Sequence, residues 1–191
     1  MMPTSDTYPV PAATAAAAIA VLYAFVAAPA IARGDMPAST LAASAVLGGG
    51  LALASAIDLR RFRLPDTITL TLLAAGLAFA WRLNWDPSLL WRAIAAVGGY
   101  AFIRVIDIGY KAVRGRHGIG QGDAKLFAAA GAWLGPEGLP TALLYACAAA
   151  LLYVAARQLS GRPLTATQRI AFGPFLSLGI WLVWVWGPVA L

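Results

Sequence analysis

The chain has 191 residues, of which 61% are apolar and 12% are charged, and its mean hydropathy is +0.75. An ordinary soluble domain carries about 25% charged and about 45–50% apolar residues. A globule of this size could not hide so much apolar surface from water. The composition therefore excludes a soluble enzyme, a disordered protein and a disulfide-rich secreted domain. It indicates a polytopic membrane protein of the all-α class, since the alternating ten-residue segments of a barrel are absent.

Apolar stretches of roughly 20 residues predict the membrane helices in chain order. The expected helical segments are 11–32, 40–57, 67–83, 89–110, 124–134, 139–156 and 170–188. The fifth of these seven segments is too short to cross alone, and a Gly135-Pro136-Glu137-Gly138 turn follows it. We expect a single transmembrane domain over 1–191, with an extra, uncleaved first helix within 1–39 and the core within 40–191. The lone cysteine, Cys147, is expected to be a small buried residue, since it permits neither a disulfide nor a zinc cluster.

The basic residues are unevenly distributed between the two sides of the predicted bundle. One side holds Arg60, Arg61, Arg63, Lys111, Arg114, Arg116, Arg157, Arg162 and Arg169, and the other holds Arg33, Arg82 and Arg92. Cytoplasmic loops carry the excess of Lys and Arg, so the first side is expected to be cytoplasmic and the C-terminus to lie outside. The net charge of +6 indicates contact with membrane lipid rather than with nucleic acid. Three tryptophans near the end, Trp181, Trp184 and Trp186, are expected to form an interfacial belt.

Two of the eight acids stand out because both fall at the expected cytoplasmic membrane edge. Asp58 closes the second span and Asp123 opens the fifth segment, so they come from different helices. If the two carboxyls meet, repulsion makes them share one proton. The ionised carboxyl can then take a proton from water while the protonated one polarises a scissile carbonyl, as in an aspartic protease, and no metal is needed. Alternatively, Asp58 forms local ion pairs with the arginines that follow it, and Asp123 caps its helix.

The remaining polar residues of interest have simpler interpretations. Asp66 follows Leu64-Pro65 and is expected to cap the third helix. Asp107 shares a helical face with Arg104 and Lys111, which favours a structural ion pair, although Asp107 is also the best candidate for a third acid near the site. His117 stands in a basic loop without metal-binding partners and is expected to be solvated.

Three segments resemble the motifs of a known family, the type IV prepilin peptidases, which are Gly-x-Gly-Asp intramembrane aspartic proteases. The first, 58–66, has an Asp followed by Leu-Pro-Asp. The second, 118–126, contains Gly-Gln-Gly-Asp-Ala-Lys and continues through Gly-Ala-Trp-Leu-Gly at 131–135. The third, 171–175, contains Phe-Gly-Pro. The segments stand in the family's order and cover the chain from about residue 58 onward.

The resemblance implies an inner-membrane endopeptidase that uses Asp58 and Asp123 as its catalytic pair and needs no cofactor or metal. It implies a supporting role for the other motif residues: Pro65, Asp66, Gly120, Gly122 and Lys125. The implied partner is a precursor of a type IV pilin or pseudopilin, whose short leader lies in the cytoplasm and is removed at a Gly just before an apolar helix. Family members of this kind serve type IV pili and protein secretion.

Longer family members carry paired Cys-x-x-Cys motifs associated with N-methylation of the processed pilin. The chain has one cysteine, so we expect peptidase activity without methyl transfer; labelled S-adenosylmethionine and a precursor would test this. Two other classes remain open. A small proton- or cation-coupled transporter could use Asp58, Asp107 or Asp123 as a relay, and a non-catalytic membrane subunit of a secretion machine could use its acids only for capping and pairing.

Overall fold

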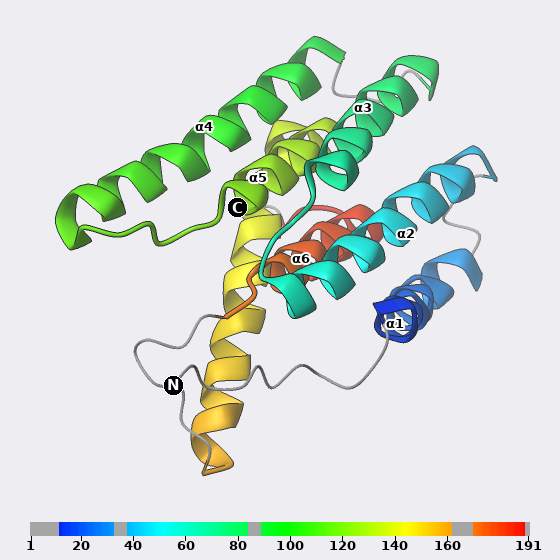
Figure 1. Ribbon diagram of the computed structural model, residues 1–191. Helices are drawn as coiled ribbons and strands as arrows, with labels where there is room; N and C mark the ends of the chain where they lie inside the picture. The colour runs from blue at the N-terminus through cyan, green and yellow to red at the C-terminus, as the bar shows by residue number, and fades with distance from the viewer. Residues whose placement is uncertain (1–11, 33–37, 84–88, 162–169, 190–191) are drawn as a thin grey trace.

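A computed structural model describes residues 12–32, 38–83, 89–161 and 170–189 (Figure 1). Within these ranges the chain forms six helices and no strand, as an all-α protein should. The helices are α1 (Ala12–Ala32), α2 (Ala38–Arg61), α3 (Asp66–Leu83), α4 (Leu89–Arg114), α5 (Gln121–Leu159) and α6 (Gly173–Trp186). Helix α5 is central because it packs against α3, α4 and α6, while α1 packs against α2 and α6.

The outer surface of the bundle is apolar, as the composition predicts for a membrane protein. Among the described helices, three are long and apolar enough to cross a membrane: Thr40–Arg61, Leu89–Arg114 and Gln121–Leu159. Large apolar side chains such as Phe25 and Val97 are more than two-thirds exposed, which water would penalise and lipid favours. Cys147 is exposed on this surface, so its expected burial is wrong.

The predicted fifth and sixth segments form one bent element, α5, rather than two separated helices. Gly135 has φ 74° and ψ −178°, which interrupts the helix, and Pro136 starts the next turn. Proline suits a first helical position because its missing N–H would have no partner there. The turn signal at 135–138 was therefore located correctly, but it produces a bend without a loop. Figure 1 shows the second half of α5, in yellow and orange, running in a different direction from the first.

Arg92 was assigned from the sequence to the basic residues of the outer side. In the structure its side chain is buried at this bend. Its guanidinium donates hydrogen bonds to the carbonyl oxygens of Ala132, at 3.2 Å, and Trp133. Pro136 has no N–H to offer the Ala132 carbonyl four residues before it. Arg92 therefore satisfies acceptors that the bend leaves free inside the bundle.

Replacing Arg92 should destabilise the bend. We expect Arg92→Met to lower the free energy of unfolding by about 1–3 kcal/mol, because buried carbonyls lose their donor. Thermal unfolding in detergent measures this loss. Arg82→Met is the matched control, since Arg82 is exposed in the last turn of α3 at the same end of the bundle. An equal effect of both substitutions would contradict the assignment.

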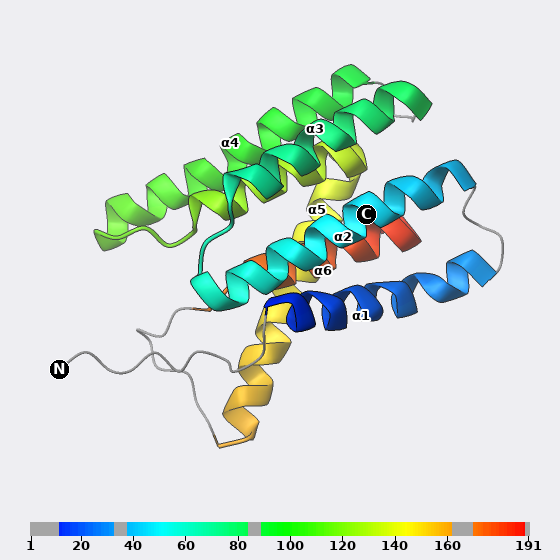
Figure 2. The ribbon, with the colours of Figure 1, turned by 45° about the vertical axis from the view of Figure 1, so that its right-hand side comes forward.

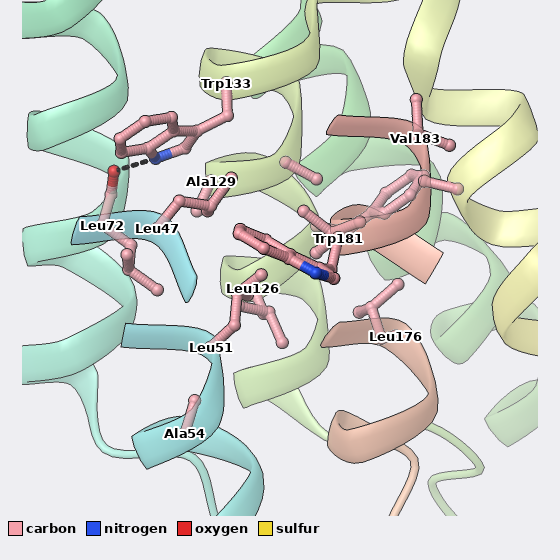
Figure 3. Packing of buried hydrophobic residues seen from close by; sticks show 14 of the residues in the cluster. Leu47, Leu51, Ala54, Leu72, Leu126, Ala129, Trp133, Leu176, Trp181 and Val183 are labelled. Carbon is pink, nitrogen blue, oxygen red and sulfur yellow. Dashed lines mark hydrogen bonds between the residues drawn. The ribbon is translucent and has the colours of Figure 1, made fainter. Parts of the chain in front are cut away.

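Aromatic side chains join the helices in the core (Figure 3). The Trp133 indole on α5 donates to the Leu72 carbonyl on α3 at 2.7 Å. Trp181 on α6 is buried, stacks on Tyr23 of α1 at 5.3 Å and donates to the Tyr23 carbonyl at 2.9 Å. Trp184 donates to Ser44 on α2 at 2.8 Å. Trp181 and Trp184 therefore pack between helices, a role that the sequence did not predict.

Several helix ends meet at one end of the bundle. Figure 2 shows there, at the left, the last turns of α2 and α4 and the first turns of α3, α5 and α6. The basic residues at or beside these termini therefore gather at the same end: Arg60, Arg61, Arg63, Lys111, Arg114 and Arg116. Arg157, which was predicted on the same side, lies in the last turn of α5. Arg33, Arg162 and Arg169 lie outside the described residues.

Candidate functional site

Asp58 lies in the last turns of α2 and is 5% exposed. The backbone N–H of Gly173, the first residue of α6, donates to Asp58 Oδ2 at 3.0 Å. A helix N-terminus presents free N–H groups and a partial positive charge, so it suits a carboxylate. The contact requires glycine, because a Cβ atom at position 173 would lie 2.7 Å from Asp58 Oδ2. The α6 start therefore holds the Asp58 carboxyl in one position.

Asp123 lies in the first turn of α5, whose N-cap is Gly120. Its carboxyl turns back toward the N-cap backbone, since a Cβ atom at Gly120 would lie 3.2 Å from Asp123 Oδ2. This corresponds to one half of a capping box, since Gly120 has no side chain to provide the other half. The charges of Asp58 and Asp123 also act on each other. The fold therefore places the two predicted acids close enough for their charges to interact, whereas the N-cap position, which was the alternative for Asp123, is taken by Gly120.

Gly122 allows the two acidic motifs to touch. A Cβ atom at this position would lie 2.7 Å from the Cβ of Leu64, in the segment between Asp58 and Asp66. The glycine is therefore needed for close approach. Gly120, by contrast, has an ordinary extended backbone with φ −69° and ψ 144°, which any residue can adopt.

An ion pair links the same two segments at the surface. Lys125 Nζ on α5 lies 2.6 Å from Asp66 Oδ1 at the start of α3. Asp66 is the first residue of α3, so it does not occupy the N-cap position predicted for it. Its side chain makes this ion pair instead. The Pro65 carbonyl accepts the first helical N–H bonds, from Ile68 at 3.2 Å and Thr69 at 3.3 Å. Pro65 and Asp66 therefore place α3, and with it the turn after Asp58, against α5.

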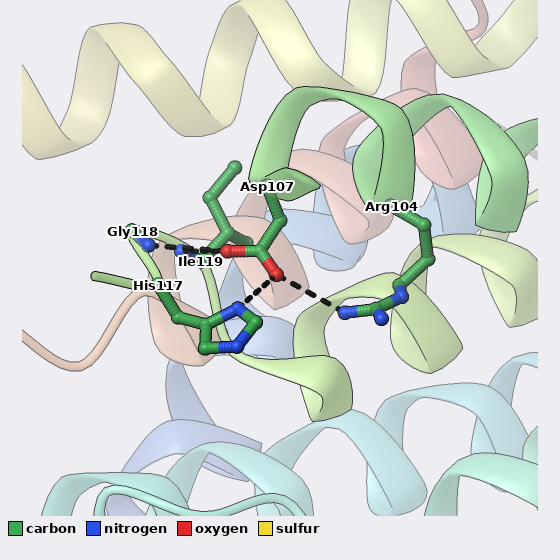
Figure 4. Close-up of polar contacts among 5 residues, drawn as sticks. All are labelled: Arg104, Asp107, His117, Gly118 and Ile119. Atoms are coloured by element: carbon green, nitrogen blue, oxygen red, sulfur yellow. Dashed lines mark hydrogen bonds and ion pairs between the residues drawn. The ribbon is translucent and has the colours of Figure 1, made fainter. Parts of the chain in front are cut away.

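Asp107 is an anchor for the loop between α4 and α5 (Figure 4). The expected ion pair with Arg104 is present at 3.1 Å. His117 is not simply solvated as predicted, because its Nδ1 lies 2.7 Å from Asp107 Oδ2. Asp107 also accepts backbone bonds from the loop. Its carboxylate therefore holds the loop that leads to Asp123.

Two features of the site were not predicted as such. Gly173 has a recognisable signal, a Gly-Pro pair at a helix start in the third motif segment. Phe62, directly after α2, has φ 50°, a left-handed backbone that costs a non-glycine residue about 1 kcal/mol or more; no pattern in the sequence announces it. Within the described ranges, no group of three or more His, Cys, Asp or Glu side chains could hold a metal ion.

The matched region of the chain includes both acids. The model of the type IV leader peptidase family matches residues 45–155, more than half of the chain. The chain belongs to this family. The match covers Asp58, Asp66, Asp107 and Asp123 but neither α1 nor Gly173. Asp58 and Asp123 therefore lie within the region that matches the family, whereas Gly173 lies beyond it.

Similar curated proteins carry the name prepilin leader peptidase/N-methyltransferase. That of Burkholderia pseudomallei (strain 1026b) is 41% identical over 75% of this chain and 46% of its own length. That of Aeromonas salmonicida (strain A449) is 37% identical over 69% of this chain and 44% of its own. That of Escherichia coli (strain K12) is 42% identical over 65% of this chain and 54% of its own length. The chain spans about half the length of these relatives. No solved structure gives a significant match.

Proposed function

We propose that this protein is a membrane aspartic endopeptidase that removes the short leader from type IV prepilin or pseudopilin precursors. The observation that carries the proposal is the meeting of Asp58 and Asp123, from separate helices and separate family motifs, at one end of the bundle. The names of the relatives support the substrate class. Residues 40–191 supply the catalytic core, and α1 packs on it as an additional helix.

Each acid has a role that follows from its contacts. Asp58 accepts the Gly173 N–H and so is the better place for negative charge; Asp123 holds the proton that the pair shares. Asp58 takes a proton from water, the water oxygen attacks the scissile carbonyl carbon, and Asp123 gives its proton to the carbonyl oxygen. The intermediate then collapses: the C–N bond breaks, the departing amine takes the proton from Asp58, and Asp123 recovers its own. The products are the leader carboxylate and a new N-terminal amine.

The active site faces the cytoplasm in this proposal. Arg60, Arg61, Lys111 and Arg114 end the helices that surround it, and basic residues mark the cytoplasmic side of inner-membrane proteins. The apolar helix of a precursor would lie in the membrane, with its leader on the cytoplasmic side. The bond between them then comes to the membrane edge, where α2 ends and α5 begins. The exposed apolar surface and the basic termini contact lipid.

A reconstituted cleavage assay tests the proposal. The full chain in lipid vesicles is incubated with a panel of prepilins and pseudopilins, and mass spectrometry detects the products. We expect leader removal after the glycine that precedes the apolar helix, and no removal when leucine replaces that glycine in the precursor. Absence of cleavage across the panel by folded protein would refute the peptidase. A pH- or cation-driven flux in the same vesicles would instead indicate the transporter.

The ion pair between Lys125 and Asp66 should matter more for activity than for stability. We expect Lys125→Met to lower the rate of cleavage about tenfold, because α3 and α5 lose their link beside the acids. The melting temperature should change little, because partly exposed ion pairs contribute about 0–1 kcal/mol; the Asp66 side chain is 61% exposed. The charge-swapped double variant Asp66→Lys/Lys125→Asp should recover part of the rate. A double variant no better than Lys125→Met would count against this role.

A further inference from the structure

The loop from 115 to 120 joins α4 to α5, and one buried carboxylate holds it. Asp107, in the last two turns of α4, is 1% exposed. Its two oxygens have different partners (Figure 4). Oδ1 accepts the backbone N–H groups of Gly118 and Ile119, both at 3.1 Å. Oδ2 faces the guanidinium of Arg104 at 3.1 Å and the Nδ1 of His117 at 2.7 Å.

These contacts act directly upstream of Asp123. Ile119 precedes Gly120, the N-cap of α5, and the Gly120 carbonyl accepts the Asp123 N–H at 3.2 Å. Only three residues therefore separate the anchored backbone from the acid. Because the first turn of a helix follows the placement of its N-cap, a shift of the loop moves the Asp123 carboxyl as well.

His117 adds a side-chain connection between the loop and the same carboxylate. Its ring is half exposed, so burial alone does not hold it in place. A neutral imidazole can donate from Nδ1, and a protonated one adds a charge-assisted bond. In either state the loop is tied to Asp107 at three points: the His117 ring and the backbones of Gly118 and Ile119.

We propose that Asp107 and His117 form a clamp that positions Asp123 for catalysis, a role that rests on the proposed peptidase function. Both are assigned as positioning residues that act through the loop that starts α5. The clamp is separate from the ion pair between Lys125, which follows Asp123 in α5, and Asp66 of α3.

Paired substitutions of His117 test the clamp without disturbing a buried position. We expect His117→Ala to lower kcat about tenfold with KM within about twofold, because the acid is misplaced while substrate contacts remain. His117→Asn, whose amide nitrogen can take the place of Nδ1, should restore kcat to within about threefold of the wild type. Equal losses in the two variants, or a loss confined to KM, would overturn the proposal.

Asp107→Asn provides the second arm, with Arg104→Gln as its matched control. The asparagine oxygen can keep the backbone bonds of Gly118 and Ile119, but its amide nitrogen replaces the Oδ2 atom that faces His117 and Arg104. We therefore expect kcat to fall about 10- to 100-fold. Arg104 contacts the same Oδ2 atom, but from within α4 and not from the loop. Arg104→Gln should therefore stay within about threefold of the wild type. A loss as large as that of Asp107→Asn would assign the effect to α4 itself and overturn the clamp.

Limited trypsin digestion of the full-length protein in detergent reports on the loop independently of peptidase activity. Arg114 and Arg116 flank its beginning. We expect cleavage there to be several-fold faster in His117→Ala and Asp107→Asn than in the wild type, and unchanged in His117→Asn and Arg104→Gln. Unchanged cleavage in all four variants would overturn the clamp even if activity fell. If trypsin cuts the variants faster but the wild type has no peptidase activity, the proposed function is refuted, whereas the anchoring of the loop by Asp107 is supported.

Discussion

Asp58→Asn and Asp123→Asn are each expected to abolish leader cleavage, with kcat lowered at least about a thousandfold. Asparagine matches the size of aspartate but neither accepts the proton of water nor donates one to the scissile carbonyl oxygen. Because the two acids act as a unit, the double variant should lose little more than either single one. Mass spectrometry of a precursor incubated with each purified variant measures the loss.

The control for these substitutions is Glu137→Gln, which removes an exposed carboxylate next to the bend of α5. It should cleave the precursor at the wild-type rate. All three variants should reach the membrane in equal amounts and melt cooperatively in detergent, so that loss of activity is separated from loss of folding. Cleavage surviving in either aspartate variant would contradict the catalytic pair.

Gly173→Ala is expected to lower kcat about a hundredfold while leaving the protein folded. The added Cβ would lie 2.7 Å from Asp58 Oδ2, closer than such atoms approach, so the carboxyl must move away from the N–H that holds it. A misplacement of about 1 Å at a catalytic group costs about a hundredfold in rate. Alanine forms helices better than glycine, so α6 should not be weakened by the change itself.

Gly49→Ala is the matched control for Gly173→Ala. Gly49 lies in α2, the helix that carries Asp58, and no other part of the described chain would come within 4 Å of an added Cβ. We expect normal cleavage and a stability equal to or above that of the wild type, since alanine is favoured over glycine within helices by about 0.5–1 kcal/mol. Comparable losses in both variants would mean that position 173 has no special relation to Asp58.

The positions of the acids on their helices followed from local sequence. Asp58 stands where an apolar run meets arginines, and Asp123 follows a glycine-rich turn, so the ends of both helices could be predicted. Their meeting was a hypothesis that the motifs favoured. The Gly173 contact could not be predicted from spacing, because its two partners are 115 residues apart and only the packing of α6 against α2 joins them.

Interior and exterior positions were harder to distinguish. In a soluble helix, polar residues mark the outer face, but here lipid-facing and core-facing residues are both apolar. Trp181 was therefore predicted at the membrane interface, although it stacks on Tyr23 in the core. Cys147 was predicted to be buried, although it is exposed. Arg92 was counted as an outer charge, although it binds the carbonyls at the bend.

The sequence by itself determined the membrane class, the helical fold, the side on which positive charge collects and the acids available for catalysis. These properties depend on composition and on short-range sequence pattern, which can be read without knowing which residues are in contact. Only the tertiary structure decided that α5 bends at Gly135 without a loop, that His117 binds Asp107, and that the α6 start holds Asp58. Each of these depends on which helices pack together, and in so apolar a chain the hydrophobic pattern does not encode that choice.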